Sequence, residues 1–257
     1  MSHIFQDLLA TDRVLRVFSV SRIVHPVVFD VLGMAGGFDG FWLDQEHGGM
    51  TVPQVQLASA CARANRLGMI VRMAPTGYSQ ATQNLEAGAD GLMAARLSSA
   101  AEAEEFVRWC KFAPRGDRGL NSSGFDARYT FKPLAEFTRE ANRENFVAVQ
   151  IETLGALEEV DQIAAIDGVD MLFLGPADMS QALGCIGQVN HEKVWEAVAS
   201  ISAACRRHGK PWGTVPAGPD YAARCVELGC RMLTLANETL ALRRGVEALK
   251  EWYAEFF

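Results

Sequence analysis

The sequence lacks long apolar runs, basic clusters and a recognisable leader. No apolar run reaches the roughly 20 residues that a helix needs to cross a bilayer, and the first residues show no basic-then-apolar signal segment. The net charge of −7 disfavours nucleic acid and anionic membranes as partners, because both bind basic surfaces. We therefore expect a cytoplasmic protein that binds neither nucleic acid nor membrane.

The sequence also lacks closely paired cysteines and any sign of a domain boundary. The six cysteines lack the CxxC spacing of a zinc site, and a chain of 257 residues that is 49% hydrophobic can bury a large core without disulfides. No internal repeat, low-complexity stretch or linker divides the chain. We expect reduced thiols and a single domain spanning residues 1–257.

Eight short apolar segments alternate with amphipathic, helix-like ones. They are Val14–Val20, Phe38–Asp44, Met69–Met73, Gly91–Ala95, Phe146–Ile151, Met171–Leu174, Trp212–Val215 and Arg231–Leu235. Such alternation predicts a parallel sheet, and eight units in this length predict a (β/α)8 TIM barrel. An open doubly wound sheet is the main alternative, although no GxGxxG follows the first strand. The segment from Gly116 to Asn145 is interpreted as a long loop on the carboxyl-terminal face of the barrel.

Polar residues follow several of these strands, at the barrel end where active sites form. The most informative segment is Phe38–Gly49, in which an apolar strand ends in Asp44, Glu46 and His47. The ordinary pKa of histidine, about 6.5, suits proton transfer near neutrality. A structural histidine is the alternative. Arg72 ends the next strand and could bind an oxyanion or form an ion pair with Asp44 or Glu46.

Two carboxylates close two later strands. Glu152 and Asp178 could offer two hard oxygen ligands to Mg²⁺ or Mn²⁺. The alternative is that Asp178 caps the following helix while Glu152 pairs with an arginine. The tight turn before Asp178 also predicts exposed backbone N–H groups that attract anions.

Together these motifs resemble the HpcH/HpaI aldolase family, the metal-dependent class II pyruvate aldolases of the phosphoenolpyruvate-binding barrels. The matching segments occur in family order: Leu43–Gly48, Ile70–Met73, Leu85–Met93, Arg115–Leu120, Val149–Thr153 and Gly168–Ser180. The resemblance implies reversible cleavage of a 4-hydroxy-2-oxo acid to an aldehyde and pyruvate, or a related 2-oxo acid such as hydroxypyruvate, through a metal-stabilised enolate. It leaves the aldehyde open.

The resemblance also implies roles for individual residues. Glu152 and Asp178 match the ligands of a divalent metal, Mg²⁺, Mn²⁺ or Co²⁺. His47 matches the catalytic base, Arg72 the transition-state stabiliser and Asp44 a supporting carboxylate. Residues that match contacts of the 2-oxo acid are Gln150, Gly175, Pro176, Ala177 and Asp178.

Three residues depart from the family pattern. Glu86 stands where relatives often have an aspartate that pairs with the histidine. Gly48 and Gly49 follow His47 where relatives commonly have Ala-Pro, which we interpret as a more open or flexible rim.

The resemblance further implies a homohexamer, a trimer of dimers, and the apolar end Trp252–Phe257 would suit a subunit contact of the C-terminal helix. The rival functions are a CoA-thioester lyase or a 2-oxo acid decarboxylase on the same barrel, and a non-catalytic barrel that binds oxo acids.

Overall fold

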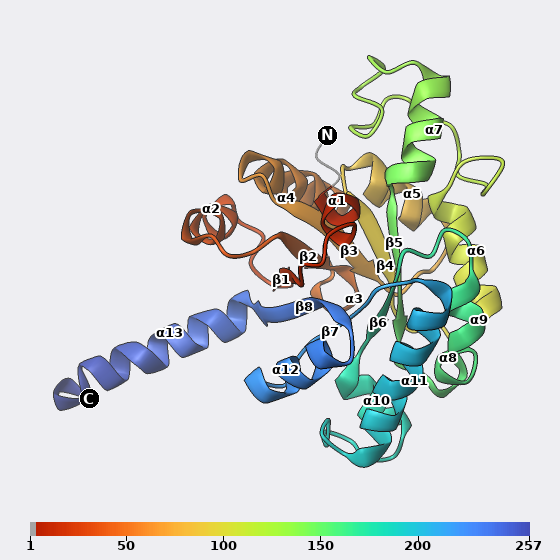
Figure 1. Cartoon of the computed structure of the whole chain (residues 1–257). Helices are drawn as coiled ribbons and strands as arrows, with labels where there is room; N and C mark the ends of the chain where they lie inside the picture. Colours follow the sequence, from red (N-terminus) through yellow and green to blue (C-terminus); the bar gives the residue numbers. More distant parts are fainter. Residues whose placement is uncertain (1–3) are drawn as a thin grey trace.

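The computed structural model describes residues 4–257, and its strands close into a parallel barrel (Figure 1). Each strand pairs with the next, and the last strand pairs with the first. The strands are β1 (Leu15–Val20), β2 (Gly40–Asp44), β3 (Gly68–Met73), β4 (Gly91–Ala94), β5 (Phe146–Ile151), β6 (Met171–Leu174), β7 (Trp212–Thr214) and β8 (Cys230–Asn237). The predicted TIM barrel is confirmed, and every strand boundary lies within two residues of its predicted place.

Helices separate the strands and surround the barrel (Figure 1). Before β5 they are α1 (Ile4–Leu9), α2 (Pro26–Ala35), α3 (Gln45–Gly48), α4 (Val52–Ala64), α5 (Tyr78–Glu86), α6 (Ala100–Cys110) and α7 (Leu134–Glu144). After β5 they are α8 (Leu154–Glu158), α9 (Val160–Ala165), α10 (Pro176–Ala182), α11 (Glu192–His208), α12 (Pro219–Glu227), α13 (Glu238–Trp252) and the 3₁₀ turn η1 (Ala254–Phe256).

Alternate strand residues build two cores, one inside the barrel and one beneath the helices. Phe5 of α1 belongs to the inner core and stacks on Phe146 at 5.5 Å between ring centroids. Trp42 and Phe173 meet edge to face at 5.3 Å in the same core. Trp42 also lines the cavity at the barrel mouth, so it forms part of the floor beneath the site.

A short motif, Gly-x-Asp, precedes β2, β4 and β6. Each aspartate accepts a hydrogen bond of 2.7 to 2.9 Å from a backbone N–H at the start of the preceding strand. Each glycine has φ between +87° and +101°, a conformation that residues with a side chain rarely adopt. The same aspartate hydrogen bond therefore joins adjacent strands at three places in the barrel.

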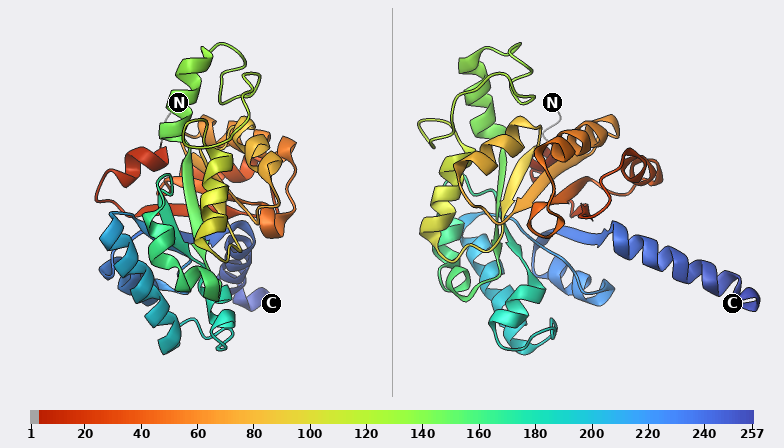
Figure 2. Two further views of the ribbon diagram at one scale, coloured as in Figure 1. Left: turned by 90° about the vertical axis from the view of Figure 1, so that its right-hand side faces the viewer. Right: turned by 180° about the vertical axis from the view of Figure 1, so that it is seen from behind.

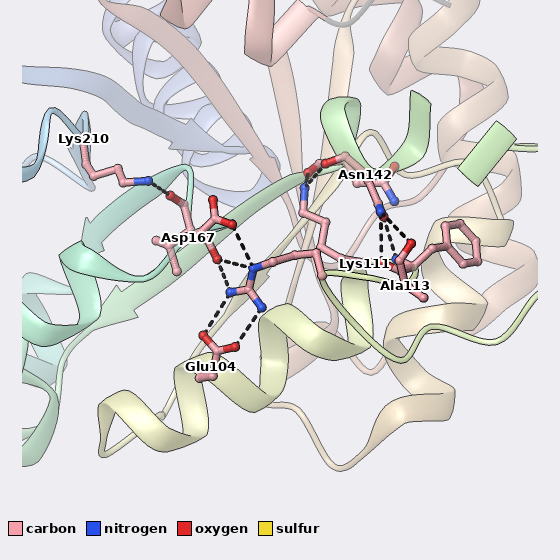
Figure 3. Close-up of polar contacts among 10 residues, drawn as sticks. Glu104, Lys111, Ala113, Asn142, Asp167 and Lys210 are labelled. Atoms are coloured by element: carbon pink, nitrogen blue, oxygen red, sulfur yellow. Dashed lines mark hydrogen bonds and ion pairs between the residues drawn. The ribbon is translucent and has the colours of Figure 1, made fainter. Parts of the chain in front are cut away.

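The segment between α6 and β5 lies at the amino ends of the strands. The Lys111 Nζ donates hydrogen bonds to the carbonyls of Asn142 (3.0 Å) and Asn145 (2.6 Å), which lie just before β5 (Figure 3). The Arg115 guanidinium binds the Glu104 carboxylate and the carbonyl of Asp167, which lies just before β6. The predicted loop on the carboxyl-terminal face is wrong. Helix α6 runs antiparallel to β4, so the chain leaves it at the opposite face, and residues 134–144 are helical.

Helix α13 projects away from the barrel as an arm (Figures 1 and 2). Its large exposed apolar side chains include Leu242, Val246, Leu249 and Trp252. Among the helices of residues 4–257, none is long and apolar enough to cross a membrane.

Candidate active site

The carboxylate of Asp44 organises the end of β2. Its Oδ1 accepts hydrogen bonds from the backbone N–H groups of Glu46 (3.0 Å) and His47 (3.3 Å), which caps the short helix α3. Asp44 is also the register partner of Arg72 on β3. One buried side chain therefore fixes both the turn that carries His47 and the neighbouring arginine.

Arg72 is held between two carboxylates and a ring. Its Nε and Nη2 contact Asp44 at 3.1 and 2.6 Å, its Nη1 lies 2.8 Å from the Glu46 Oε2, and its Cζ lies 4.7 Å from the centroid of Trp42. The structural ion pair that the sequence left open is therefore present with both partners. A guanidinium has five N–H groups, so one on each terminal nitrogen remains for a ligand.

His47 lies at the rim of the mouth, with a side chain that is 61% exposed. Its Nε2 lies 3.8 Å from the Glu46 Oε2. The turn that carries it is fixed from behind, because the amides of Gln45 and Asn84 exchange hydrogen bonds of 3.0 and 2.7 Å. The imidazole is thus accessible while its backbone is anchored.

Glu86 does not lie beside His47 in this chain. Its Oε2 accepts a 3.0 Å hydrogen bond from Asn121, and it lines a separate hollow near Phe125 and Tyr129. The reason is helical geometry. Asn84 faces the His47 turn, and a residue two positions later points roughly 200° away around α5. The expected pairing is therefore not formed, and the carboxylate nearest to His47 is Glu46.

The two glycines after His47 have different local roles. A Cβ on Gly48 would lie 2.5 Å from the carbonyl oxygen of Ser21, and Gly49 ends α3 at φ 64°. Gly48 thus allows the β2 turn to pack closely on the β1 turn, whereas a Cβ on Gly49 would meet no atom within 4 Å. The more open or flexible rim stays a prediction.

Glu152 follows β5 and is almost completely buried, with 1% of its surface exposed. Its Oε1 accepts a 2.9 Å hydrogen bond from the backbone N–H of Arg96, and its Oε2 accepts one from the Gln150 amide. Burial, reinforced by the nearby carboxylates Glu46 and Asp178, raises its pKa to about 7, against the opposing effects of the Arg96 N–H and of Arg72. The negative charge is costly there unless a cation joins it.

Asp178 lies in the first turn of α10, and Gly175 occupies the N-cap. The predicted capping alternative for Asp178 is therefore not seen. Its carboxylate is 41% exposed and lies 4.0 Å from the Arg96 guanidinium. A Cβ on Gly175 would approach both the Glu152 Oε2 and the Gln150 Nε2 to 2.5 Å. Glycine at this position keeps the space around Glu152 open.

One cavity of about 590 Å³ collects most of the predicted residues at the carboxyl ends of the strands. The predicted residues that line it are Asp44, His47, Arg72, Gln150, Gly175, Pro176, Ala177 and Asp178. Glu152 lies beside this wall through its contact with Gln150. The structure therefore brings the predicted site residues together at the mouth, with Glu86 as the exception.

Among the residues around this cavity that sequence reasoning missed, three are charged. Arg96 contacts both Glu152 and Asp178, and has φ 64°, which is rare for a residue with a side chain. Arg22 lines the cavity after β1, and Glu238 binds the backbone around it. The available signal was position alone, because Arg22 and Arg96 each follow the end of a strand.

Comparisons with known proteins agree with this geometry. The family model described as HpcH/HpaI aldolase/citrate lyase matches residues 24–244. A hydroxypyruvate/pyruvate aldolase from Pseudomonas aeruginosa is 33% identical over 219 residues, covering 85% of this chain and 81% of the relative. A 4-hydroxy-2-oxo-heptane-1,7-dioate aldolase from Klebsiella pneumoniae is 34% identical over 213 residues, covering 83% and 80%.

A solved structure shows the same likeness in three dimensions. The HpcH/HpaI aldolase from Desulfitobacterium hafniense DCB-2 superposes with a TM-score of 0.87 and 31% identity, over 96% of each chain. Together with the family match, this establishes that the chain belongs to the HpcH/HpaI aldolase/citrate lyase family.

Proposed function

We propose that this enzyme is a divalent-metal-dependent aldolase that cleaves a 4-hydroxy-2-oxo acid to an aldehyde and pyruvate or hydroxypyruvate. The observation that carries the proposal is the grouping in one mouth of buried Glu152, neighbouring Asp178, paired Arg72 and accessible His47. The names of the two aldolase relatives support the substrate class.

Glu152 and Asp178 would hold the cation, Mg²⁺, Mn²⁺ or Co²⁺. Two carboxylates suit these ions, which complete their coordination with water and substrate oxygens. The fit is supported by the raised pKa of Glu152 and by the space that Gly175 leaves over it. When bound, the cation would supply positive charge beside the oxygen on which charge develops.

The remaining residues have distinct tasks in this proposal. Gln150 and the Gly175–Asp178 turn would bind the 2-oxo acid, and the free N–H groups of Arg72 would stabilise the developing oxyanion. In cleavage, His47 would take the proton of the 4-hydroxyl group while the C3–C4 bond breaks and its electron pair passes to C3. Asp44 would keep Arg72 and the His47 turn in place.

The proposal predicts that complete chelation stops exchange of the pyruvate methyl protons with solvent deuterium. Adding Mg²⁺, Mn²⁺ or Co²⁺ should restore the exchange, measured by proton NMR without any aldehyde. Exchange that continues at the native rate after metal removal would contradict the metal-dependent assignment.

The same assay separates an enzyme from a barrel that only binds oxo acids. The His47→Ala variant should still bind pyruvate with metal. It should exchange the methyl protons of pyruvate with solvent about 10²- to 10⁴-fold more slowly than wild type. A CoA-thioester lyase would instead show acyl-CoA cleavage, and a decarboxylase would release CO₂ from the 2-oxo acid.

We also propose that α13 forms a contact in a homo-oligomer, a hexamer by the resemblance. Leu242, Val246 and Leu249 are exposed at helical spacing, as expected for a face covered by another subunit. The variant Leu242→Glu/Val246→Glu should reduce the oligomer in sedimentation velocity. The control Arg244→Glu changes charge on the other side of α13 and should leave the oligomer intact. A wild-type monomer at micromolar concentration would contradict the proposal.

A further inference from the structure

The turn that follows β1 directs three successive backbone N–H groups at one carboxylate. The Glu238 Oε1 accepts hydrogen bonds from the N–H groups of Ser21 (2.9 Å), Arg22 and Ile23 (3.1 Å). Successive N–H groups that converge in this way form a concave site for an anion. Here the anion is a side chain of the protein itself, so the carboxylate fixes the shape of the turn.

Glu238 is suited to this task by its place in the fold. It is the first residue of α13, where the helix dipole favours a negative charge, and it is only 5% exposed. Hydrogen bonds to a charged acceptor are roughly twice as strong as those between neutral groups. The neighbouring residues Asn237 and Thr239 line the mouth cavity, whereas Glu238 does not. The carboxylate therefore supports the turn without reaching a bound substrate.

The same turn supports the backbone that carries His47. The carbonyl oxygen of Ser21 lies against Gly48, so closely that a Cβ at position 48 would come within 2.5 Å of it. Gly48 directly follows His47 and is the last residue of α3. The contact joins the turn after β1 to the turn after β2. A shift of the first turn would therefore move the second or leave a gap beside it.

The position of His47 depends on such backbone supports. Its side chain is 61% exposed, and within residues 4–257 no hydrogen bond holds its imidazole. Asp44 binds the N–H of His47 at the end of β2, and the Ser21 carbonyl supports the turn from β1. A displacement of about 1 Å in a reacting group can reduce a rate about 10²-fold. The support from β1 therefore matters for proton transfer.

We propose that Glu238 is a positioning residue for His47 and acts through the turn after β1. Its carboxylate holds this turn, the turn supports Gly48, and Gly48 keeps the base at the place that proton transfer requires. This inference rests on the proposed aldolase function, in which His47 is the base. The groups assigned to the 2-oxo acid, Gln150 and the Gly175–Asp178 turn, follow β5 and β6 across the barrel. Loss of Glu238 should therefore affect turnover and not the binding of pyruvate.

The test measures exchange of the pyruvate methyl protons with solvent deuterium in the metal-loaded, full-length enzyme. Glu238→Ala should lower kcat for exchange about 10- to 100-fold and change the KM for pyruvate less than about twofold, because only the transition state needs the base in place. Glu238→Gln keeps an oxygen acceptor without the charge and should show a smaller loss. This milder variant serves for every comparison if Glu238→Ala does not fold.

A double-mutant cycle shows whether Glu238 acts through His47. In the His47→Ala background the base is already absent, so adding Glu238→Ala should lower the remaining exchange less than about twofold. A general distortion of the mouth would instead reduce exchange by the same factor in both backgrounds. That result, an unchanged kcat in Glu238→Ala, or a loss confined to KM would overturn the inference.

A second glutamate of α13 provides the matched control. Glu247 is half exposed and pairs with Arg243 at 2.8 Å. Glu247→Ala removes a carboxylate from the same helix and should leave kcat and KM at the wild-type values. A loss of kcat as large as that of Glu238→Ala would overturn the inference, because the effect would then belong to α13 in general.

Exchange by wild type separates the proposed function from the role of Glu238. Absence of exchange in metal-loaded wild type would remove the proposed aldolase function itself. Exchange in wild type together with an equal loss in the two backgrounds would remove only the assignment of Glu238.

Discussion

Glu152→Gln should abolish metal-dependent activity and, in metal-free protein at pH 8, make the fold more stable. We expect exchange and cleavage to fall by about 10³-fold or more, because a metal contributes several kcal/mol to stabilising the charge of the transition state. We expect the free energy of unfolding to rise by about 3 kcal/mol, which corresponds to a pKa raised from 4.5 to about 7.

The gain in the free energy of unfolding of Glu152→Gln over wild type should increase with pH. Between about pH 4.5 and 7 the folded state keeps a proton on Glu152 that the unfolded state has lost, so this group makes wild type less stable as pH rises through that window. Above pH 7 the buried charge of Glu152 destabilises wild type to the full extent, and below about pH 4.5 this destabilisation vanishes. The advantage of Glu152→Gln over wild type should therefore shrink to less than about 1 kcal/mol by pH 5.

Urea unfolding of both proteins at pH 5 and pH 8, after chelation, measures this difference. Asp178→Asn is the matched control, because its carboxylate is 41% exposed and solvent already stabilises its charge. That variant should lose activity without gaining comparable stability. A Glu152→Gln protein that is less stable than wild type at pH 8 would show that burial of this charge is not costly.

The barrel could be predicted because parallel strands covered on both faces read as continuous apolar segments. All residues of β3 and β5 are buried, which leaves little ambiguity about where those strands begin and end. The polar residues after them could then be assigned to one mouth, because parallel strands in a closed barrel share a carboxyl end. Arg72, Gln150 and Asp178 line the same cavity for that reason.

Contacts that depend on how helices and turns pack could not be predicted in the same way. The direction of Glu86 depends on the rotation of α5, which the Gln45–Asn84 amide pair fixes. The close approach of Gly48 to Ser21 joins two turns from different strands. The hydrogen bonds of Glu238 link residues more than 200 positions apart. Local sequence patterns carry no information about contacts between residues so far apart in the chain.

Arg72→Met should have the second large effect, and it should reduce stability and activity together. The substitution leaves Asp44 and Glu46 without their counter-charge in a poorly solvated place, and breaking a buried ion pair in this way costs about 3 to 5 kcal/mol. It also removes the donors proposed to stabilise the oxyanion, which should slow exchange by about 10²- to 10³-fold. Urea unfolding and deuterium exchange measure the two effects separately.

A triple variant distinguishes the structural effect from the catalytic one. Adding Asp44→Asn and Glu46→Gln to Arg72→Met removes the stranded charges, and asparagine at position 44 can still cap α3. We expect most of the lost stability to return while the exchange remains slow. Recovery of exchange along with stability would mean that Arg72 acts only as a support for the two carboxylates. Slow exchange in a protein of restored stability would assign to the guanidinium a direct role in the reaction.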